Sequence, residues 1–568
     1  MFIMETAIRE AIQGVLKKLG IEPVDFAVEH PADLSHGDYA TNVAMALSKR
    51  LGKNPRELAE QFCAELGGVL PEVVAIEIAG PGFINFRLSR NFFSDAVARV
   101  RTFGDAWGKN DSWAGKEVLV EYTSPNLFKP LHIGNLVGNI VGESLTRLLE
   151  SAGATVKRLN YPSDIGLTVA KGVWGLRATG GNPRDIQALG EAYRYGNEAY
   201  ETDEIKKAEI IAVNQALYAE SDQELNQLRD WGILTSKERL LTICNSLGTK
   251  FDSFGTIFES DAAPKGIELV KQNMPRVFKE SEGAIVYEGE KVGLHTRVFI
   301  NSNGLPTYEA KDLGNFAIKQ ERFPEWTHSI VVTGNEQTEY FKVIYAAIKE
   351  IFPEIVQHEK TLEHIPTGFL TLTTGKMSSR KGNTLSGEQM LDELEKEALG
   401  RIKDNVRENE LDVPLATKVA TAAIKYQILR HNTGSNIVFD KERALSFEGD
   451  SGPYLQYTHA RIISVLEKAK EAGVAPSVDY APSVAYPIEK TLYRFEEVIR
   501  EALVARAPHL VTTYLTELAG AFNTFYAGER IADATDEYAP YKAAVADAVR
   551  ITLKNGLWTL GIKAPLKM

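Results

Sequence analysis

A strand, a turn and a helix follow one another at residues 117–149, and this pattern constrains the fold more than any other part of the chain. The run 117–122 is short, aliphatic and β-branched, which is typical of a buried strand. From Leu136 to Leu149, apolar residues recur at helical spacing. Strand and helix patterns then alternate to about residue 390, which predicts a doubly wound, Rossmann-like parallel sheet.

The start of this predicted helix carries the residues His132-Ile133-Gly134-Asn135. His132 and Asn135 are three residues apart, so they project from one side of the helix start. Free backbone N–H groups and the positive end of the helix dipole favour phosphate there. Gly134 lets a nucleotide approach the backbone closely.

A second stretch, Gly375–Asn383, places two lysines in a loop of small residues. Lys376 and Lys381 can supply mobile cations, while Ser378 and Ser379 keep the loop small enough to close over a leaving pyrophosphate. Each stretch alone is weak evidence, since a basic loop is usually only solvated. Together, in this order and after strands, the two stretches predict a nucleoside triphosphate site.

The two stretches resemble the HIGH and KMSKS signatures of the class I aminoacyl-tRNA synthetases, at His132–Asn135 and Lys376–Arg380. Further stretches narrow the resemblance to the arginyl-tRNA synthetase family, and it extends over nearly the whole chain. These stretches are 121–126, 308–312, 336–337 and 452–461.

The resemblance implies an arginine–tRNA ligase. Such an enzyme activates L-arginine with ATP to arginyl-adenylate and pyrophosphate, then transfers arginine to the 3′-terminal adenosine of tRNA(Arg), usually only once tRNA is bound. ATP would enter as its Mg²⁺ complex, and no protein-bound metal, zinc or organic cofactor is expected. The residues implied in catalysis are His132, Asn135, Lys376 and Lys381, and those implied in ATP binding are Gly134, His132, Asn135, Lys376, Met377, Ser378 and Ser379.

A guanidinium is planar, always charged and donates in a fork, so its pocket needs a carboxylate, further acceptors and an aromatic face. Tyr308 and Asp312 are four residues apart and share a face if this segment is helical. An ordinary exposed helix face would show the same spacing. The residues that the resemblance implies in arginine binding are Glu121, Ser124, Asn126, His132, Tyr308, Asp312 and Gln337.

The sequence departs from the family pattern in three places. Asn135 replaces the second histidine of the HIGH signature, which keeps a neutral donor but cannot become cationic. The Asn-Lys that precedes the signature in the family is Phe128-Lys129 here, and the histidine that often follows the pocket glutamine is replaced near Tyr340. We expect catalysis to be retained.

Three domains are expected. Residues 1–110 form an α+β unit that contacts the tRNA elbow, residues 116–400 form the catalytic domain with a helical insertion at about 185–290, and residues 410–568 form an all-α anticodon-binding bundle. Phe83 could equally be a core strand residue, and Tyr454 and Tyr457 could be core packing. The residues expected to bind tRNA are Phe83, Asn85, Tyr454, Gln456, Tyr457, His459 and Arg461.

Composition favours a soluble cytoplasmic protein, and a monomer is expected. The only two cysteines are far apart in sequence, which fits a reducing compartment, and no apolar stretch approaches the ~20 residues that span a bilayer. The net charge of −12 does not oppose tRNA binding, because residues 1–110 carry 12 basic against 14 acidic side chains and residues 430–568 carry 16 against 17.

Two alternatives remain at this stage. A non-catalytic RNA-binding paralogue would keep the folds, but the basic loop, His132 and Asp312 argue against it. Another class I synthetase, or a nucleotidyltransferase with the same triphosphate site, would lack the combination of Tyr308, Asp312 and Gln337. A nucleotidyltransferase would also have no use for so large a helical bundle.

Overall fold

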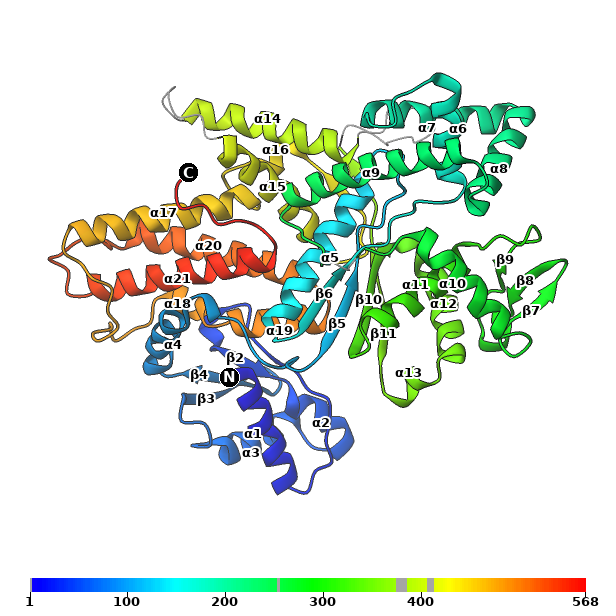
Figure 1. The fold of residues 1–568 in the computed structure, drawn as a ribbon. Coiled ribbons are helices and arrows are strands. Elements are labelled where there is room, and N and C mark those ends of the chain that lie inside the picture. The colour runs from blue at the N-terminus through cyan, green and yellow to red at the C-terminus, as the bar shows by residue number, and fades with distance from the viewer. Residues whose placement is uncertain (1–2, 253–255, 374–385, 406–412) are drawn as a thin grey trace.

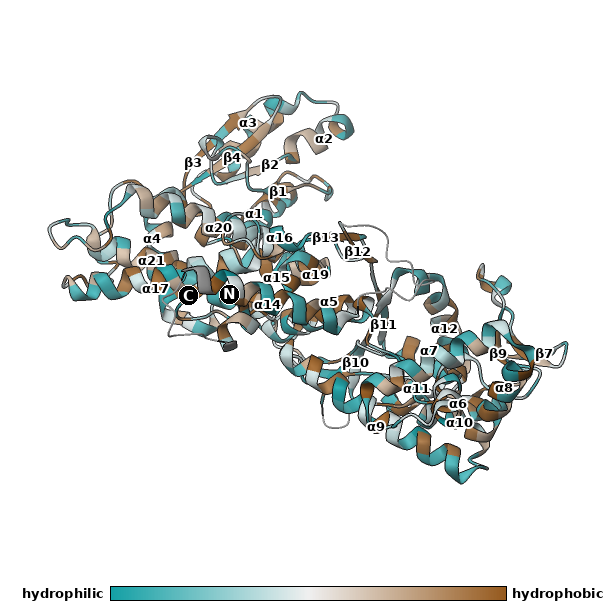
Figure 2. Ribbon diagram, turned by 90° about the horizontal axis from the view of Figure 1, so that it is seen from above, coloured by the Kyte–Doolittle hydropathy of each residue, from teal (hydrophilic) through white to brown (hydrophobic). Residues whose placement is uncertain are grey.

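The computed structural model describes residues 3–252, 256–373, 386–405 and 413–568, and it divides into three parts (Figure 1). An N-terminal unit lies against a C-terminal helical bundle, and a parallel sheet lies between that bundle and a large insertion. Figure 2 shows the same arrangement from above, with the insertion at the end of the molecule opposite the N-terminal unit. The sequence prediction of an α+β unit, a parallel-sheet domain and an all-α bundle is confirmed.

The N-terminal unit is a four-stranded antiparallel sheet in the order β1-β2-β4-β3 with helices packed on one face. Alternate residues of β4 (Ile84, Phe86 and Leu88) join the buried faces of the helices in one core. The elements are α1 Met4–Lys18, β1 Val28–Glu29, η1 Leu34–His36, β2 Tyr39–Thr41, α2 Val43–Leu51, α3 Pro55–Leu66, β3 Val73–Ala79, β4 Phe83–Leu88, α4 Arg90–Phe103 and η2 Gly104–Ala106.

The central sheet has four parallel strands in the order β11-β10-β5-β6. Its central strands are buried on both sides, which is why they are continuous aliphatic runs in the sequence. The elements of this part are β5 Glu117–Glu121, α5 Ile133–Ser151, β6 Thr155–Leu159, α11 Tyr308–Arg322, β10 Trp326–Gly334, η4 Asn335–Gln337, α12 Thr338–Ile351, α13 Glu354–Gln357, β11 Thr361–Thr367, β12 Leu370–Leu372 and α14 Gly387–Asn405.

Residues 361–372 contain two strands rather than one continuous strand. β11 stays in the central sheet, while β12 pairs with β13 (Ile437–Phe439) of the following part. The break falls at Gly368, where a Cβ atom would lie 2.0 Å from the backbone oxygen of Ser435. Only glycine allows the two segments to approach so closely, and the strand turns there.

The insertion between β6 and α11 is mostly helical, as expected, but it also contains a three-stranded antiparallel sheet in the order β7-β8-β9. Its elements are α6 Leu167–Thr179, α7 Ile186–Thr202, α8 Glu204–Ala219, α9 Gln223–Ser246, α10 Glu259–Gln272, β7 Lys279–Ser281, β8 Ala284–Tyr287, η3 Gly289–Val292 and β9 Arg297–Ile300.

The C-terminal bundle packs its apolar faces into one core that is continuous with the α5 side of the central sheet. Residues 487–504 form two helices rather than one, because the chain bends at Tyr493 and Arg494. The helices are α15 Val413–Leu429, α16 Lys441–Ala444, α17 Gly452–Glu471, α18 Pro487–Leu492, α19 Phe495–Val504, α20 His509–Gly528 and α21 Ala539–Thr559.

Ion pairs fix the N-terminal unit to this bundle. Arg90 contacts Glu489 at 3.0 Å, and Lys490 contacts Asp38 at 2.9 Å. Glu497, on α19, accepts a hydrogen bond from the Tyr39 hydroxyl at 2.6 Å. The carboxylates in these contacts are buried, so breaking one contact would leave an uncompensated buried charge.

Candidate active site

The candidate site lies at the carboxyl edge of the central sheet. β5 ends at Glu121, β10 ends at Gly334 and is followed by η4 with Gln337, and α5 and α11 begin near the same edge. In an open parallel sheet, ligands bind outside the carboxyl ends of the strands. The fold therefore brings the predicted phosphate and arginine residues to one end of the sheet.

The start of α5 orients two hydrogen-bond donors outward. His132 is the N-cap of the helix, and its Nδ1 accepts the backbone N–H of Gly134 at 3.1 Å. The Oδ1 of Asn135 accepts the backbone N–H of His132 at 3.0 Å. Both acceptors are therefore used within the helix start. The proton of a neutral His132 lies on Nε2, and Nε2 and the Asn135 amide nitrogen remain as donors.

The environment of His132 favours its neutral form. Partial burial lowers the pKa of His132, and the nearby Lys129 ammonium lowers it further. Near pH 7 the ring is a neutral donor through Nε2. Asn135, which stands where the family signature has its second histidine, can therefore act together with His132. Neither side chain needs a positive charge to donate a hydrogen bond.

The lysine loop falls outside the described residues. Lys376, Met377, Ser378, Ser379 and Lys381 therefore remain predictions. The chain after this loop returns to the start of α5, since Gly387 donates its backbone N–H to the Leu131 carbonyl at 2.9 Å and Ser386 forms a β-bridge with His132.

Phe128 anchors the loop between β5 and α5. It is 1% exposed, and its backbone N–H donates to the Ser236 hydroxyl of α9 at 3.1 Å. Its ring lies on two helix glycines, Gly172 of α6 and Gly232 of α9, where a Cβ atom would come within 2.7 Å and 2.2 Å of ring atoms. The aromatic residue in place of the family's asparagine is thus a packing anchor between the loop and the insertion.

Replacing Gly232 with alanine is expected to destabilise the insertion by about 1–3 kcal/mol, because the new methyl group overlaps the buried ring. Gly14→Ala is the matched control, since nothing lies within 4 Å of a Cβ atom at that helix position. The control should be neutral or stabilising. Thermal unfolding measures both. Equal shifts in the two variants would contradict the packing role of Phe128.

Two other predicted residues shape the same loop. The Ser124 hydroxyl accepts the backbone N–H of Tyr161 at 3.0 Å, and Asn126 forms a β-bridge with Ser163. The Asn126 side chain is exposed beside the start of α5. The Ser124 hydroxyl is therefore engaged by a backbone N–H group, while the Asn126 side chain is accessible to a ligand.

Asp312 is half-buried on α11. The Tyr340 hydroxyl donates to its Oδ2 at 2.6 Å. Burial raises the pKa of Asp312 to about 7; the Tyr340 hydrogen bond lowers it, and the carboxylates of Glu121 and Glu259 raise it again. Within the described ranges, no lysine or arginine lies at ion-pair distance from Asp312. A cationic ligand would supply that missing partner.

The surroundings of Asp312 include polar residues that the sequence analysis missed. Glu121 is paired with Lys319 at 2.5 Å and accepts from Asn315 at 2.9 Å, while Glu259 is paired with Lys311. Lys311, Asn315 and Lys319 recur every four residues along α11, and this spacing was the feature of the sequence that indicated a shared polar face. All three are nearly fully buried, on the face of the helix that meets the sheet.

Two tyrosines and Gln337 complete this region. The Tyr161 hydroxyl is buried without a hydrogen-bond partner among the described residues, and the nearby carboxylates of Asp312 and Glu259 add to the effect of burial in raising its pKa well above the usual value. Tyr308 is 58% exposed, and the Lys311 ammonium lies 4.4 Å from its ring centroid. Gln337 is half-buried in η4. Tyr308 thus lies at the open side of the site and Asp312 at its base.

The candidate tRNA residues separate into accessible and buried sets. Phe83 and Asn85 lie on the face of β4 opposite its core residues, so the core interpretation of Phe83 is wrong. Asn85 is only 5% exposed, beneath the loop at Gly37. In the bundle, Tyr454 is half-buried with its hydroxyl bonded to Asn523, Tyr457 is 41% exposed, and Arg461 lies over the Tyr526 ring.

Gln456 and His459 do not fit the predicted tRNA contact. Both are at most 1% exposed. Gln456 donates to the Lys563 carbonyl at 2.7 Å, and His459 bonds the Pro565 carbonyl through Nδ1 at 3.0 Å. Burial lowers the pKa of His459 to about 4. These side chains hold the last residues of the chain against the bundle, so we correct that assignment.

Within the described part of the chain, no group of three or more His, Cys, Asp or Glu side chains is arranged to hold a metal ion. A search of the same residues for a helix long and apolar enough to cross a membrane found none.

Family models match all three parts of the chain. The model described as "tRNA synthetases class I (R), catalytic domain" matches residues 104–441, the "DALR anticodon binding domain" matches residues 455–568, and the "Arginyl tRNA synthetase N terminal domain" matches residues 4–88.

Individual relatives agree with the models. The chain is 31% identical to the "Arginine--tRNA ligase" of Streptococcus suis (strain 05ZYH33) over 99% of both chains, and 29% identical to that of Ligilactobacillus salivarius over 99% of this chain and 98% of the relative. The structure titled "Thermus thermophilus arginyl-tRNA synthetase" superposes with a TM-score of 0.81 at 27% identity, with all of each chain covered. The chain belongs to the arginyl family of class I tRNA synthetases.

Proposed function

We propose that the chain uses the carboxyl edge of its central sheet to activate L-arginine with Mg·ATP and then to load it onto tRNA(Arg). The observation that carries the arginine assignment is Asp312, a carboxyl group without an ion-pair partner among the described residues. A guanidinium supplies the missing positive charge and several donors at once. Of the other carboxylates nearby, Glu121 and Glu259 already have lysine partners, and Asp164 accepts two hydrogen bonds from Ser260.

The arginine side chain would enter from the side of Tyr308. The guanidinium pairs with Asp312 at the base, the exposed ring of Tyr308 offers an aromatic face, and the Tyr161 hydroxyl offers a further hydrogen-bond partner. Gln337 lies on the segment that follows β10 at the same edge. The α-carboxylate end would then lie toward Asn126 and the start of α5.

Adenylation follows from this placement. A carboxylate oxygen of arginine attacks the α-phosphorus of ATP, and the bond from that phosphorus to the bridging oxygen of pyrophosphate breaks. His132 Nε2 and the Asn135 amide donate to the α-phosphate oxygens, on which charge develops. The resemblance to the family adds Lys376 and Lys381 as cations for the departing pyrophosphate. The adenylate then loses its acyl group to the terminal 2′-OH of tRNA.

The tRNA surface is proposed to extend over the N-terminal unit and the bundle. Phe83 on the outer face of β4, together with Tyr454, Tyr457 and Arg461 on α17, supports this assignment through stacking and charge. The domain limits proposed are 1–110, 116–400 and 410–568. Both cysteines are free, which supports work in a reducing compartment such as the cytoplasm.

The test is ATP–pyrophosphate exchange with each standard amino acid, with and without bulk tRNA. Exchange with arginine alone, and only when tRNA is present, is the expected result. Exchange with a different amino acid would keep the class I site and overturn the arginine pocket. No exchange under any condition would overturn the catalytic proposal in favour of a non-catalytic RNA-binding role.

The arginine KM is expected to depend on pH through Asp312. The pKa of this carboxyl group is about 7, and the guanidinium binds its ionised form. As pH falls below 7, arginine must displace a proton, so KM rises toward tenfold per pH unit; above about pH 8 it should be constant. Asp312→Asn should show a high KM without this slope. A slope that survives in Asp312→Asn would assign the titration to another group.

A further inference from the structure

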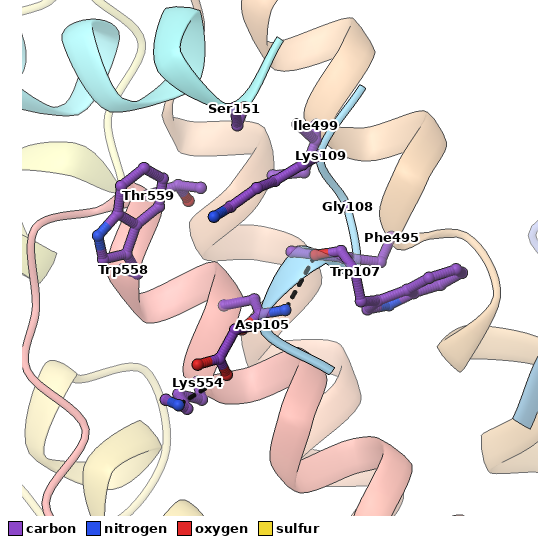
Figure 3. Close-up of a pocket in the computed structure, with 11 residues that line it drawn as sticks. Asp105, Trp107, Gly108, Lys109, Ser151, Phe495, Ile499, Lys554, Trp558 and Thr559 are labelled. Carbon is purple, nitrogen blue, oxygen red and sulfur yellow. Dashed lines mark hydrogen bonds and ion pairs between the residues drawn. The ribbon is translucent and has the colours of Figure 1, made fainter. Parts of the chain in front are cut away.

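A cavity of about 160 Å³ lies where three parts of the chain meet, far from the active site (Figure 3). Its wall comes from the segment after η2, the last residue of α5, and the helices α19 and α21 of the bundle. The residues used below are Trp107, Gly108, Lys109, Phe495, Ile499 and Trp558. The reaction described above uses none of them.

Much of the wall is apolar and closely packed. Trp107, Phe495 and Ile499 are at most 2% exposed. Gly108 lies directly on the Phe495 ring, because a Cβ atom there would come within 2.3 Å of a ring carbon. A cavity of roughly 150 Å³ with such walls holds a molecule the size of benzene. The volume therefore fits one six-membered ring.

One cation at this cavity has no carboxylate within ion-pair distance in the part of the chain that the structure describes. Lys109 reaches across the cavity toward Trp558 and Thr559 (Figure 3), and its ammonium lies 5.4 Å from the Trp558 ring centroid. Lys554 also lines the cavity, but it is paired with Asp105 at 2.7 Å. Lys109 thus adds one available positive charge to an aromatic wall.

We propose that this cavity binds a small aromatic carboxylate, with its ring among Phe495, Ile499 and Trp558 and its carboxylate on the Lys109 ammonium. Binding would join the segment after η2, α5 and the bundle through one molecule, which stabilises their docked arrangement. α5 has 19 residues and a length of about 28 Å, so the site is one helix length from His132. The ligand should not compete with ATP or arginine.

The probe is sodium benzoate, and benzamide is its uncharged analogue. Ligand-observed NMR with the full chain measures the binding of each. Benzoate should bind saturably with a Kd of about 1 mM, as the limits for so small a ligand allow, both with and without ATP and arginine. Lys109→Met should weaken benzoate at least about tenfold, the loss of one charged contact, and leave benzamide unchanged. Lys554→Met is the matched control and should change neither.

Ile499→Phe fills the cavity and should abolish binding of both probes; Lys109→Met, at an exposed side chain, tests the same site without a core change. Three results would overturn the proposal. These are no saturable binding of benzoate, equal binding to Lys109→Met and wild type, or displacement of benzoate by ATP or arginine.

Discussion

Replacing Asp312 with alanine is expected to raise the arginine KM by at least about 30-fold, since truncating one partner of a buried charge pair costs about 2–5 kcal/mol. In the variant the guanidinium would lose water without gaining a counter-charge, because Glu121 and Glu259 are already paired with lysines. The KM for ATP should stay near the wild-type value, because the α5 start does not contact Asp312. Steady-state pyrophosphate exchange with tRNA present measures both constants.

The chain offers a matched control for this experiment. Glu350, an exposed residue of α12, also accepts a hydrogen bond from a tyrosine hydroxyl, that of Tyr287, at the same 2.6 Å as Asp312 from Tyr340. Glu350→Ala removes a similar carboxylate–tyrosine pair and should leave the arginine KM unchanged. An arginine KM that barely moves in Asp312→Ala would show that the guanidinium binds elsewhere.

The sequence was sufficient to predict the elements that carry the site. The aliphatic run before Glu121 is β5, and the helical pattern that follows is α5, which begins at Ile133. Both segments have a strong hydrophobic periodicity, and their secondary structure depends on residues that are near one another in the sequence. Tyr308 and Asp312 were also predicted, but with an exposed helix face as the alternative. The structure distinguishes the two interpretations, since an ordinary exposed helix face would expose both side chains, whereas Tyr308 is exposed and Asp312 is not.

Pairings across the fold could not be predicted. Asn315 contacts Glu121 from 194 residues away, and nothing in the sequence identifies Lys319 as the cation that neutralises Glu121. Such pairs depend on where α11 packs on the sheet. The consequence for function is large, because Glu121 is already neutralised by Lys319, whereas Asp312 has no cationic side chain at ion-pair distance among the described residues.

The error at Gln456 and His459 has a related cause. A helix dense in aromatic and polar residues looks the same whether it faces RNA or the rest of the protein. Here the last residues of the chain fold back onto α17, and the carbonyls of Lys563 and Pro565 bond these two side chains. Contacts made by the end of the chain are not encoded in the local pattern of α17.

The second large effect is expected at His132. His132→Ala should lower kcat for arginine-dependent pyrophosphate exchange by about 10²–10³-fold, the usual cost of removing one preorganised donor to a developing negative charge. The arginine KM should change less than kcat, because the guanidinium contacts at Asp312 are untouched. The variant also loses the bond from Gly134 to Nδ1, which costs about 1 kcal/mol of helix capping, so thermal unfolding must be measured beside kcat.

Asn135 distinguishes capping from catalysis. Asn135→Asp keeps the oxygen that accepts the His132 N–H, so α5 should still begin at the same residue. It replaces the outward amide donor with a carboxylate oxygen, which repels phosphate. If the donors act on the α-phosphate, Asn135→Asp should lose kcat at least as severely as His132→Ala while its unfolding temperature stays near wild type. If both variants keep kcat within a few-fold of wild type, the α5 start serves only to cap its helix, and the phosphate must bind elsewhere at this edge of the sheet.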